Sequence, residues 1–470
     1  MATDILAVAN RLWNGELSTS TFHPVDHVGG FVEITDGVGF CPSFANVSAF
    51  KTGDGLLLVD TGSAPLARIV HDDIRGWSPD RLDTAVYSHG HIDHVFGVPV
   101  WEEEAAARGW PAPQVVAHHA LPDRFDRYIF TAGYNTVVNR RQFGFTDLNW
   151  PTEYRYPDRT YHETLDLDVG GVGFSLRHEK GETDDHTVTW QPDTRVLCCG
   201  DLFIWASPNA GNPQKVQRYP REWAAALRRM LTLDAEVLLP GHGFPVIGAG
   251  RVRQALTDTA DLLDSLVDQT LEVMNAGGRL DDAIHSVRVP DALGERPYLR
   301  PVYDEPEIIV HTVWRLYGGW WDGNPATLKP APERALAAEV AELAGGAGAL
   351  AARASELLDL ATGEPGPGAE GAERALRLAG HLAEQAWLAD PADPAVQRTR
   401  QQVFATRAAR ATSTMARVAQ AKSAASSACS ARGSRAWASK PADTRIRSGE
   451  KPSTSAITWS KAFRHSSRVA

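Results

Sequence analysis

The stretch Tyr87–Gly97, YSHGHIDHVFG, places four side chains that can bind a metal within six residues: His89, His91, Asp93 and His94. It follows the apolar run LDTAV, which predicts a buried strand. Alternate residues of an extended segment face the same way, so His89 and His91 can reach one ion. Asp93 and His94 can face a second ion as the chain turns into a helix. Surface histidines without a role are the competing interpretation.

The pattern of the rest of the chain predicts a domain of mixed structure followed by helices. Residues 20–250 read as short strands with a few helices, and polar residues repeatedly stand where strands end. From about 251 to about 417 the apolar spacing is helical. After that the chain is rich in Ser, Ala and Arg and lacks periodicity. We therefore predict domains over 1–250 and 251–417, and a disordered basic tail over 418–470.

Charge and composition narrow the class of protein. The net charge is −11, and residues 401–470 carry 13 Lys and Arg against 2 acids, a balance of +11 that leaves −22 for residues 1–400. Such an acidic body argues against a nucleic-acid partner. No apolar run approaches the roughly 18 residues of a membrane span, and the start shows no secretory signal. Four cysteines without a Cys-x-x-Cys pair indicate a reducing, cytoplasmic location.

The motif HGHIDH, its place after a buried strand, and the preceding strand GLLLVDTG resemble the metallo-β-lactamase superfamily. The resemblance covers roughly residues 20–250. It implies an αββα sandwich, in which two mixed sheets pack face to face with helices outside and metals lie at one edge. The expected fold class is therefore α+β, with this sandwich as the catalytic domain and an all-α domain after it.

The resemblance also implies three further ligands at the ends of later strands. RVLCCGDLF offers Asp201 as an acid that bridges two ions, and AEVLLPGHG offers His242. Where most members have a histidine, HEKGETDDHTVTW has Glu182, with His178 and His186 nearby as competitors.

These residues divide into two predicted sets. His89, His91 and Glu182 are assigned to one ion, and Asp93, His94 and His242 to the other. Asp201 joins the two sets, while the resemblance implies that Asp60 orients a histidine. Imidazole and carboxylate ligands suit zinc, so we expect two divalent ions, with Zn²⁺ preferred over Mn²⁺ or Fe²⁺.

Glu182 is similar to the ligand of the alkyl sulfatase branch, whose members append a helical dimerisation domain. YNTVVNRRQFG (134–144) and the stretch 301–333, which begins PVYDEPEIIVH, also resemble that branch. The resemblance then reaches across nearly 400 residues and implies a homodimer. Arg140 and Arg141 are candidates for binding an anionic group, because planar guanidinium donors match sulfate oxygens.

The loop after Asp201 departs from that branch. Alkyl sulfatases have a bridging Glu at this position, followed by a histidine-rich loop and an arginine. Here DLFIWASPNAGNPQKVQRYP contains no histidine, and its first arginine is Arg218. Asn209, Asn212 or Lys215 are then candidates for the anion, although a lysine does not replace a bidentate arginine.

The predicted function is that of a binuclear metal-dependent hydrolase. We expect it to act on alkyl sulfate esters or a related small anionic ester through a metal-bridging hydroxide, with Asp93 moving a proton. A lactonase, thioesterase or phosphodiesterase of the same superfamily is the main alternative. A mono-iron oxidoreductase and a non-catalytic relic are the weaker ones.

Overall fold

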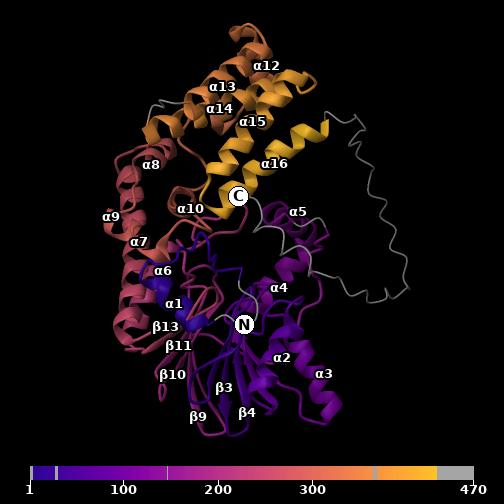
Figure 1. Ribbon diagram of the computed structural model, residues 1–470, viewed down its shortest axis with the longest axis vertical. Coiled ribbons are helices and arrows are strands. Elements are labelled where there is room, and N and C mark those ends of the chain that lie inside the picture. The colour runs from indigo at the N-terminus through magenta and orange to yellow at the C-terminus, as the bar shows by residue number, and fades with distance from the viewer. Residues whose placement is uncertain (1–3, 27–29, 145–146, 364–367, 431–470) are drawn as a thin grey trace, which may run out of the picture. The chain divides into compact units, whose positions relative to one another are not determined.

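Two mixed β-sheets form the centre of the first of two compact units (Figure 1). The computed structural model describes residues 4–26, 30–144, 147–363 and 368–430. The first unit comprises Met1–Arg140 and Thr146–Asn324, and the second comprises Arg141–Phe145 and Pro325–Ala470.

Each sheet keeps its strands in chain order. The first sheet consists of β1 (Val32–Thr35), β2 (Val38–Cys41), β3 (Val47–Thr52), β4 (Gly55–Val59), β5 (Leu82–Val86), β6 (Gln114–His118) and β7 (Arg159–Tyr161). The second consists of β8 (Thr164–Val169), β9 (Val172–Glu179), β10 (His186–Gln191), β11 (Val196–Gly200), β12 (Val237–Pro240) and β13 (Val246–Ile247). Strands β4 to β7 pair in parallel, as do β11 and β12, and the other neighbours are antiparallel.

Helices cover the outer face of both sheets. The first sheet carries α2 (Ala67–Trp77), α3 (Val98–Arg108) and α4 (Leu121–Phe130), and α5 (Ala132–Phe143) follows α4. The second sheet carries α1 (Ile5–Trp13), α6 (Pro220–Leu231) and α7 (Ala249–Asn275). Beyond α7 follow α8 (Leu280–Ser286), α9 (Asp291–Gly294), η1 (Pro297–Leu299) and α10 (Pro306–Gly318).

The alternation of side chains along β4 shows why the layers form. Leu56 and Leu58 pack under the helices on the outer face, whereas Leu57 and Val59 pack between the two sheets. Because successive side chains of a strand point to opposite faces, the continuous apolar run GLLLV fills both layers at once. The four-layer αββα sandwich predicted from the sequence is confirmed.

The first unit extends beyond the predicted domain boundary at residue 250. Helix α7 packs on the second sheet through Leu256 and Leu263, and α10 joins the same core through Val313. Helix α1, which the sequence analysis did not anticipate, buries Ile5, and the other buried members of its inner face are Val8, Ala9 and Leu12. The predicted boundary therefore falls inside a continuous core.

The second unit is helical, as predicted. It contains α11 (Pro325–Leu328), α12 (Glu333–Ala344), α13 (Ala347–Thr362), α14 (Gly368–Ala389), α15 (Pro394–Arg410) and α16 (Thr414–Ser430). Helices α13, α14 and α15 share an apolar core that includes Leu357, Leu376 and Val403.

The predicted start of the disordered tail needs correction. Residues 418–430 belong to helix α16, which buries Met415 and Ala424. This stretch is rich in alanine, the residue with the highest helix propensity, so it forms a helix without the strong periodicity that the prediction required. Residues 431–470 of the predicted tail lie outside the described residues.

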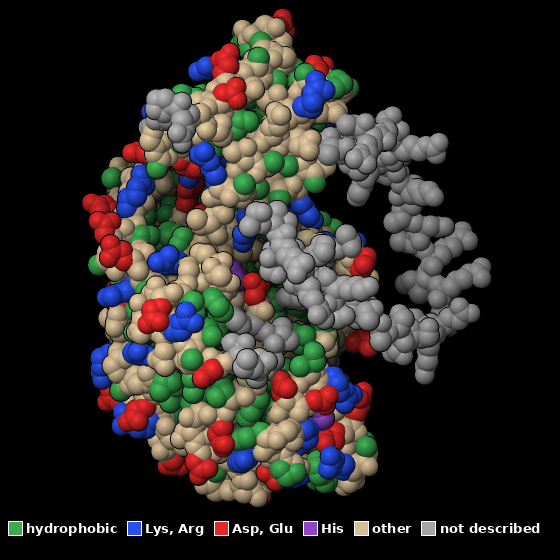
Figure 2. Space-filling view, viewed as in Figure 1, with side chains coloured by type: hydrophobic (Ala, Val, Ile, Leu, Met, Phe, Trp, Pro, Cys, Tyr) green, Lys and Arg blue, Asp and Glu red, His purple; other side chains and the backbone are tan. Residues whose placement is uncertain are grey.

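Acidic and basic side chains are interspersed over the face shown in Figure 2. In the described part of the chain, no single helix has the length and apolar character to cross a membrane. The consecutive helices α12 and α13 would together meet that test by length and composition, with a bend of 82° between them.

Candidate metal centre

The loop after β5 is held in place by Asp60, the first residue after β4. Asp60 Oδ1 accepts a hydrogen bond from the Ser88 backbone N–H at 2.7 Å, and its Oδ2 lies 2.7 Å from His94 Nδ1. With the His94 proton on Nδ1, the lone pair of Nε2 is left for a ligand. Burial opposes a charge on His94, yet the carboxylates of Asp201, Asp60 and Asp93 raise its pKa well above the usual value, so a cation at Nε2 would displace a proton. The contact of Asp60 with His94 Nδ1 is consistent with the orienting role that we expected for Asp60.

Glu182 enters the site from the turn between β9 and β10. It is fully buried, and its Oε2 lies 3.5 Å from His89 Nε2 and 3.3 Å from His91 Nδ1. Burial would raise the pKa of Glu182, but the guanidinium of Arg218 and the imidazole of His91 lower it below the usual value. The structure thus places the carboxylate of Glu182 where the sequence analysis expected a ligand.

Asp201 and His242 come from the ends of the parallel strands β11 and β12. Asp201 lies 3.7 Å from His89 Nε2, 3.5 Å from His94 Nε2 and 3.4 Å from His242 Nε2. His242 Nδ1 bonds to the backbone oxygen of Phe44 at 2.5 Å, so its Nε2 points to the acids. Residue 241 must be glycine, because an added Cβ would stand 2.2 Å from Asp201 Oδ1.

The seven predicted ligands form two groups with the spacing that metal ions need. One consists of His89, His91, Glu182 and Asp201, the other of Asp93, His94 and His242, and within each group the ligand atoms lie within 4.8 Å of one another. Asp93 Oδ2 lies 3.7 Å from His94 Nε2 and 3.4 Å from His242 Nε2.

The chemistry of these donors fits divalent cations. His94 Nε2, Glu182 Oε2 and Asp201 Oδ1 are buried and make no hydrogen bond to any described residue. Buried polar atoms are normally paired, since an unpaired one loses its hydration without compensation. Cations at the two groups would pair these atoms and balance the three carboxylates. This arrangement supports divalent metal binding, although it does not identify the metal.

Arg218 is a site residue that the sequence analysis did not assign. Its side chain is 1% exposed, Nη2 lies 3.1 Å from Glu182 Oε1, and Nη1 donates to the Glu182 backbone oxygen at 2.6 Å. Asn209, which was predicted to bind substrate, donates through Nδ2 to the same Oε1 at 2.5 Å. Both side chains therefore orient Glu182. Arg218 is the first arginine after Asp201, but its contact with Glu182 depends on the path of the intervening loop.

Asp185 and His186 accept hydrogen bonds from backbone N–H groups of the loops that carry the ligand-type residues. Asp185 accepts from the Gly90 backbone N–H at 2.9 Å and pairs with the buried Arg124 at 2.8 Å. A Cβ at position 90 would stand 2.7 Å from Arg124, so glycine is needed here for this packing. His186 accepts from the Asp201 N–H at 3.2 Å and lies outside both ligand groups.

His178, the other competitor considered for the position of Glu182, is also turned away from the ligands. Its Nε2 lies 2.9 Å from the backbone oxygen of Asp184, and its ring stacks on His118 at 3.7 Å. Like His186, it is outside both groups of ligand atoms.

Among the remaining predicted substrate residues, Lys215 interacts electrostatically with Asp93 and Glu182 of the site. Its Nζ donates to Asn139 Oδ1 at 3.0 Å, and burial together with Arg218 lowers its pKa to about 8, while Asp93 and Glu182 oppose that shift. Arg140 donates to the Leu148 backbone oxygen at 2.6 Å. Arg141 is exposed and belongs to the second compact unit, so the anion-binding roles of this arginine pair stay predictions.

A segment beyond residue 300 fastens the loop that carries Asn209. Asp304 is fully buried, and its Oδ2 accepts from the backbone N–H of Gly211 at 2.6 Å and of Asn212 at 3.1 Å. Burial raises the pKa of Asp304 to about 7. Burial, followed by the charges of Glu182, Asp93 and Asp201, raises the pKa of the neighbouring Tyr303. Residues outside the predicted catalytic domain thus complete the site.

Comparisons with known proteins agree with this geometry. Residues 42–242 match the metallo-β-lactamase superfamily, and residues 279–428 match the alkyl sulfatase dimerisation family. The linear primary-alkylsulfatase of Pseudomonas sp. (strain ATCC 19151) is 29% identical over 59% of this chain and 57% of its own. The (R)-specific secondary-alkylsulfatase of Pseudomonas sp. is 27% identical over 61% of this chain and 47% of its own. The chain thus spans about half the length of these curated relatives.

A solved structure confirms the fold over most of the chain. The stereoselective inverting sec-alkylsulfatase Pisa1 from Pseudomonas sp. aligns with a TM-score of 0.74 at 22% identity, covering 86% of this chain and 66% of that protein. This likeness extends across both the sheets and the helices that follow. Two regions of the chain therefore match known families: residues 42–242 match the metallo-β-lactamase superfamily, and residues 279–428 match the alkyl sulfatase dimerisation family.

Proposed function

We propose that this protein hydrolyses alkyl sulfate esters with two divalent cations as cofactors. One observation carries the proposal: seven ligand-type side chains from four separate segments converge in two adjoining groups, with buried donor atoms that make no hydrogen bond among the described residues. The choice of a sulfate ester rests on the curated relatives, whose names describe alkylsulfatases.

The proposed cofactors are zinc ions, because imidazole and carboxylate donors suit Zn²⁺. When bound, two such ions supply Lewis acidity and a water that is acidic enough to react near neutral pH. Among the chain's own groups, Asp93 is the candidate to accept a proton. Although burial opposes its charge, the imidazoles of His94 and His242 lower the pKa of Asp93 to about 2, so it is ionised at neutral pH.

Lys215 is the proposed partner of the sulfate group. Asn209 and Arg218 are already committed to Glu182, whereas the ammonium of Lys215 lies on the same loop and interacts with Asp93 and Glu182. Its bond to Asn139 and its place 5.6 Å from the ring of Trp150 fix its direction. A lysine ammonium is a point charge and lacks the planar pair of donors of an arginine guanidinium. The orientation of the sulfate would therefore depend on the rest of the site.

Replacing Lys215 by methionine should raise KM for an alkyl sulfate by roughly 10-fold to 100-fold, the range expected for a lost hydrogen bond to a charged group. In the unmodified protein KM should also rise above pH 8, because the amine then loses its proton. Lys215→Arg should remove that rise. Steady-state kinetics from pH 6 to pH 10 measure both effects, with Lys51→Met as the control at an exposed lysine on β3. A KM that is unchanged in Lys215→Met would exclude this role.

A panel of substrates tests the reaction class. Alkyl sulfates of several chain lengths should be turned over, while lactones, thioesters and phosphodiesters should be poor substrates, and His91→Ala should abolish the activity. Metal analysis of the same preparation should give two zinc ions per chain. Turnover of a lactone with inert alkyl sulfates would overturn the sulfatase assignment and favour another hydrolase of this superfamily. One iron per chain would favour the oxidoreductase instead.

We further propose that the protein is a homodimer in the cytoplasm. The dimer is supported by the match of residues 279–428 to the alkyl sulfatase dimerisation family. The location is supported by the small number of cysteines, which suits a reducing compartment. Light scattering during size-exclusion chromatography should give twice the chain mass of 51.1 kDa, whereas a mass of one chain would refute the dimer.

A further inference from the structure

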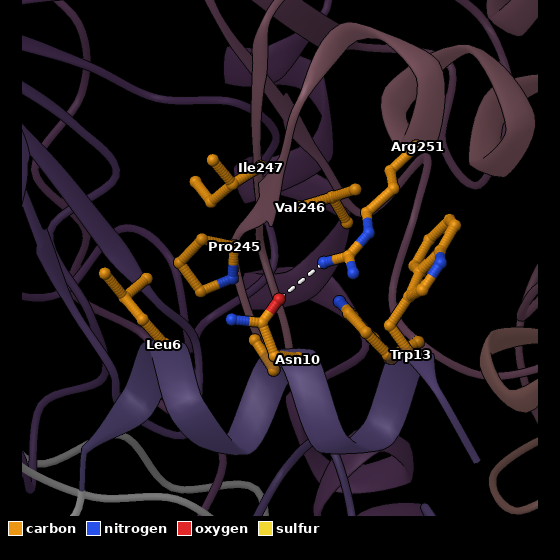
Figure 3. Close-up of a pocket in the computed structure, with 9 residues that line it drawn as sticks. Leu6, Asn10, Trp13, Pro245, Val246, Ile247 and Arg251 are labelled. Carbon is orange, nitrogen blue, oxygen red and sulfur yellow. Dashed lines mark hydrogen bonds between the residues drawn. The ribbon is translucent and has the colours of Figure 1, made fainter.

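A cavity of about 190 Å³ opens between α1, β13 and the start of α7 (Figure 3). Its lining consists of Leu6, Ala9, Asn10, Trp13, Trp205, Pro245, Val246, Ile247 and Arg251. None of the seven ligand-type residues is among them. All except Trp205 lie outside residues 42–242 and 279–428, so the matched families cover only one of the nine lining residues.

The walls combine apolar surface with a single charge. Leu6, Pro245 and Val246 provide apolar walls, and the indole of Trp13 closes one side (Figure 3). Arg251 is the one charged residue of the lining. Its Nη1 donates to Asn10 Oδ1 at 2.5 Å, and its guanidinium lies 5.4 Å from the ring centre of Trp13.

That combination favours an anion with an apolar body. A guanidinium has five N–H donors, so its bond to Asn10 leaves donors that can take an anionic head group. The Asn10 amide contributes a second donor group through its nitrogen. At the ~30 Å³ that one water molecule takes up in the liquid, the cavity has room for about six groups of that size, which suits a head group with a short apolar chain.

We propose that this cavity binds a small amphiphilic monoanion, with its carboxylate or sulfonate head on Arg251 and its apolar chain against Leu6, Trp13 and Val246. The proposal concerns a site separate from the metal centre and does not depend on the reaction proposed for that centre.

Trp205 forms one wall of the cavity. Its indole N–H donates to the Phe244 backbone oxygen at 2.7 Å, and its ring packs so closely on residue 243 that an added Cβ would stand 2.8 Å away. Trp205 is nearly fully buried and has a left-handed backbone with φ of 55°. A ligand in the cavity would contact Trp205, which connects the loop after Asp201 with the loop that carries His242.

Calorimetric titration of the metal-loaded, full-length protein with hexanoate and hexanesulfonate tests the proposal, and hexanol is the neutral probe. We expect both anions to bind more tightly than hexanol and to change the tryptophan fluorescence. The tighter of the two anions identifies the preferred head group. Arg251→Met should weaken both anions by about 10-fold or more while leaving hexanol unchanged, as for a charge-assisted hydrogen bond. Ala9→Leu, which fills the cavity, should abolish binding of all three probes.

Matched variants distinguish binding in this cavity from binding at the metal centre or elsewhere on the surface. Arg253→Met removes an arginine two residues away that pairs with Asp234 and does not line the cavity, so it should bind the anions normally. Asp201→Asn changes the metal centre and not the cavity, so this variant should also bind the anions normally. Hexanoate bound at the metal centre would instead lose affinity in this variant. Circular dichroism confirms that each variant is folded. Equal affinity in Arg251→Met and Arg253→Met, a loss in Asp201→Asn, or no binding at millimolar concentration would overturn the proposal.

Discussion

Replacing Asp201 by asparagine is expected to lower kcat/KM for an alkyl sulfate by at least about 10³-fold, since metal ions supply several kcal/mol of transition-state stabilisation at about 1.4 kcal/mol per tenfold. Asp201 lies within 3.7 Å of His89, His94 and His242, so it faces both ligand groups. Asparagine keeps the shape but removes the charge. Metal analysis of the variant should give fewer than two ions per chain.

The control for this prediction is Asp193→Asn. Asp193 is an exposed acid in the turn between β10 and β11, and the same change of carboxylate to amide there should leave the metal content and the kinetics as they were. If Asp201→Asn retained two ions and lost less than tenfold in kcat/KM, Asp201 would not be the residue that joins the two groups.

Removing Arg218 should have the largest effect on stability. Arg218 and Glu182 are each 1% exposed, and Arg218→Met would leave the Glu182 carboxylate buried without its charge partner. Breaking a buried pair in this way costs about 3–5 kcal/mol in the free energy of unfolding. Denaturant unfolding with a chelator present measures this loss, since bound cations would otherwise compensate the carboxylate.

Two further variants test the cause of that loss. The double variant Arg218→Met with Glu182→Gln removes both charges and should recover part of the stability. Arg221→Met, at a partly exposed arginine paired with Asp264 and Asp268, should cost no more than about 1 kcal/mol. A loss of similar size in Arg218→Met and Arg221→Met would contradict the importance assigned to the buried pair.

The ligand positions could be predicted because they depend on local sequence. A buried strand that ends in polar residues places those residues at a sheet edge, and the histidine-rich loop after β5 is such a case. Asp201 and His242 follow β11 and β12 in the same way. Their use as metal ligands remains a prediction, which the resemblance to the metallo-β-lactamase superfamily implies for these strand ends.

The partners of these residues could not be predicted, because they depend on the path of a long loop. Arg218 reaches Glu182 across 36 positions, and Asp304 reaches Gly211 across 93. Charge or spacing in the sequence does not specify such contacts. The helix over residues 418–430 was missed for another reason: its alanine-rich sequence has strong helical propensity but little amphipathic pattern.

The attachment of the Asn209 loop to Asp304 has a consequence for biosynthesis. When a growing chain has released His242 from the ribosome, all seven ligand-type side chains have been made, but the residue that fastens this loop has not. Domains generally fold as units, and Asp304 belongs to the same compact unit as the two sheets. We therefore expect tight cation uptake only after the nascent chain has extended through α10.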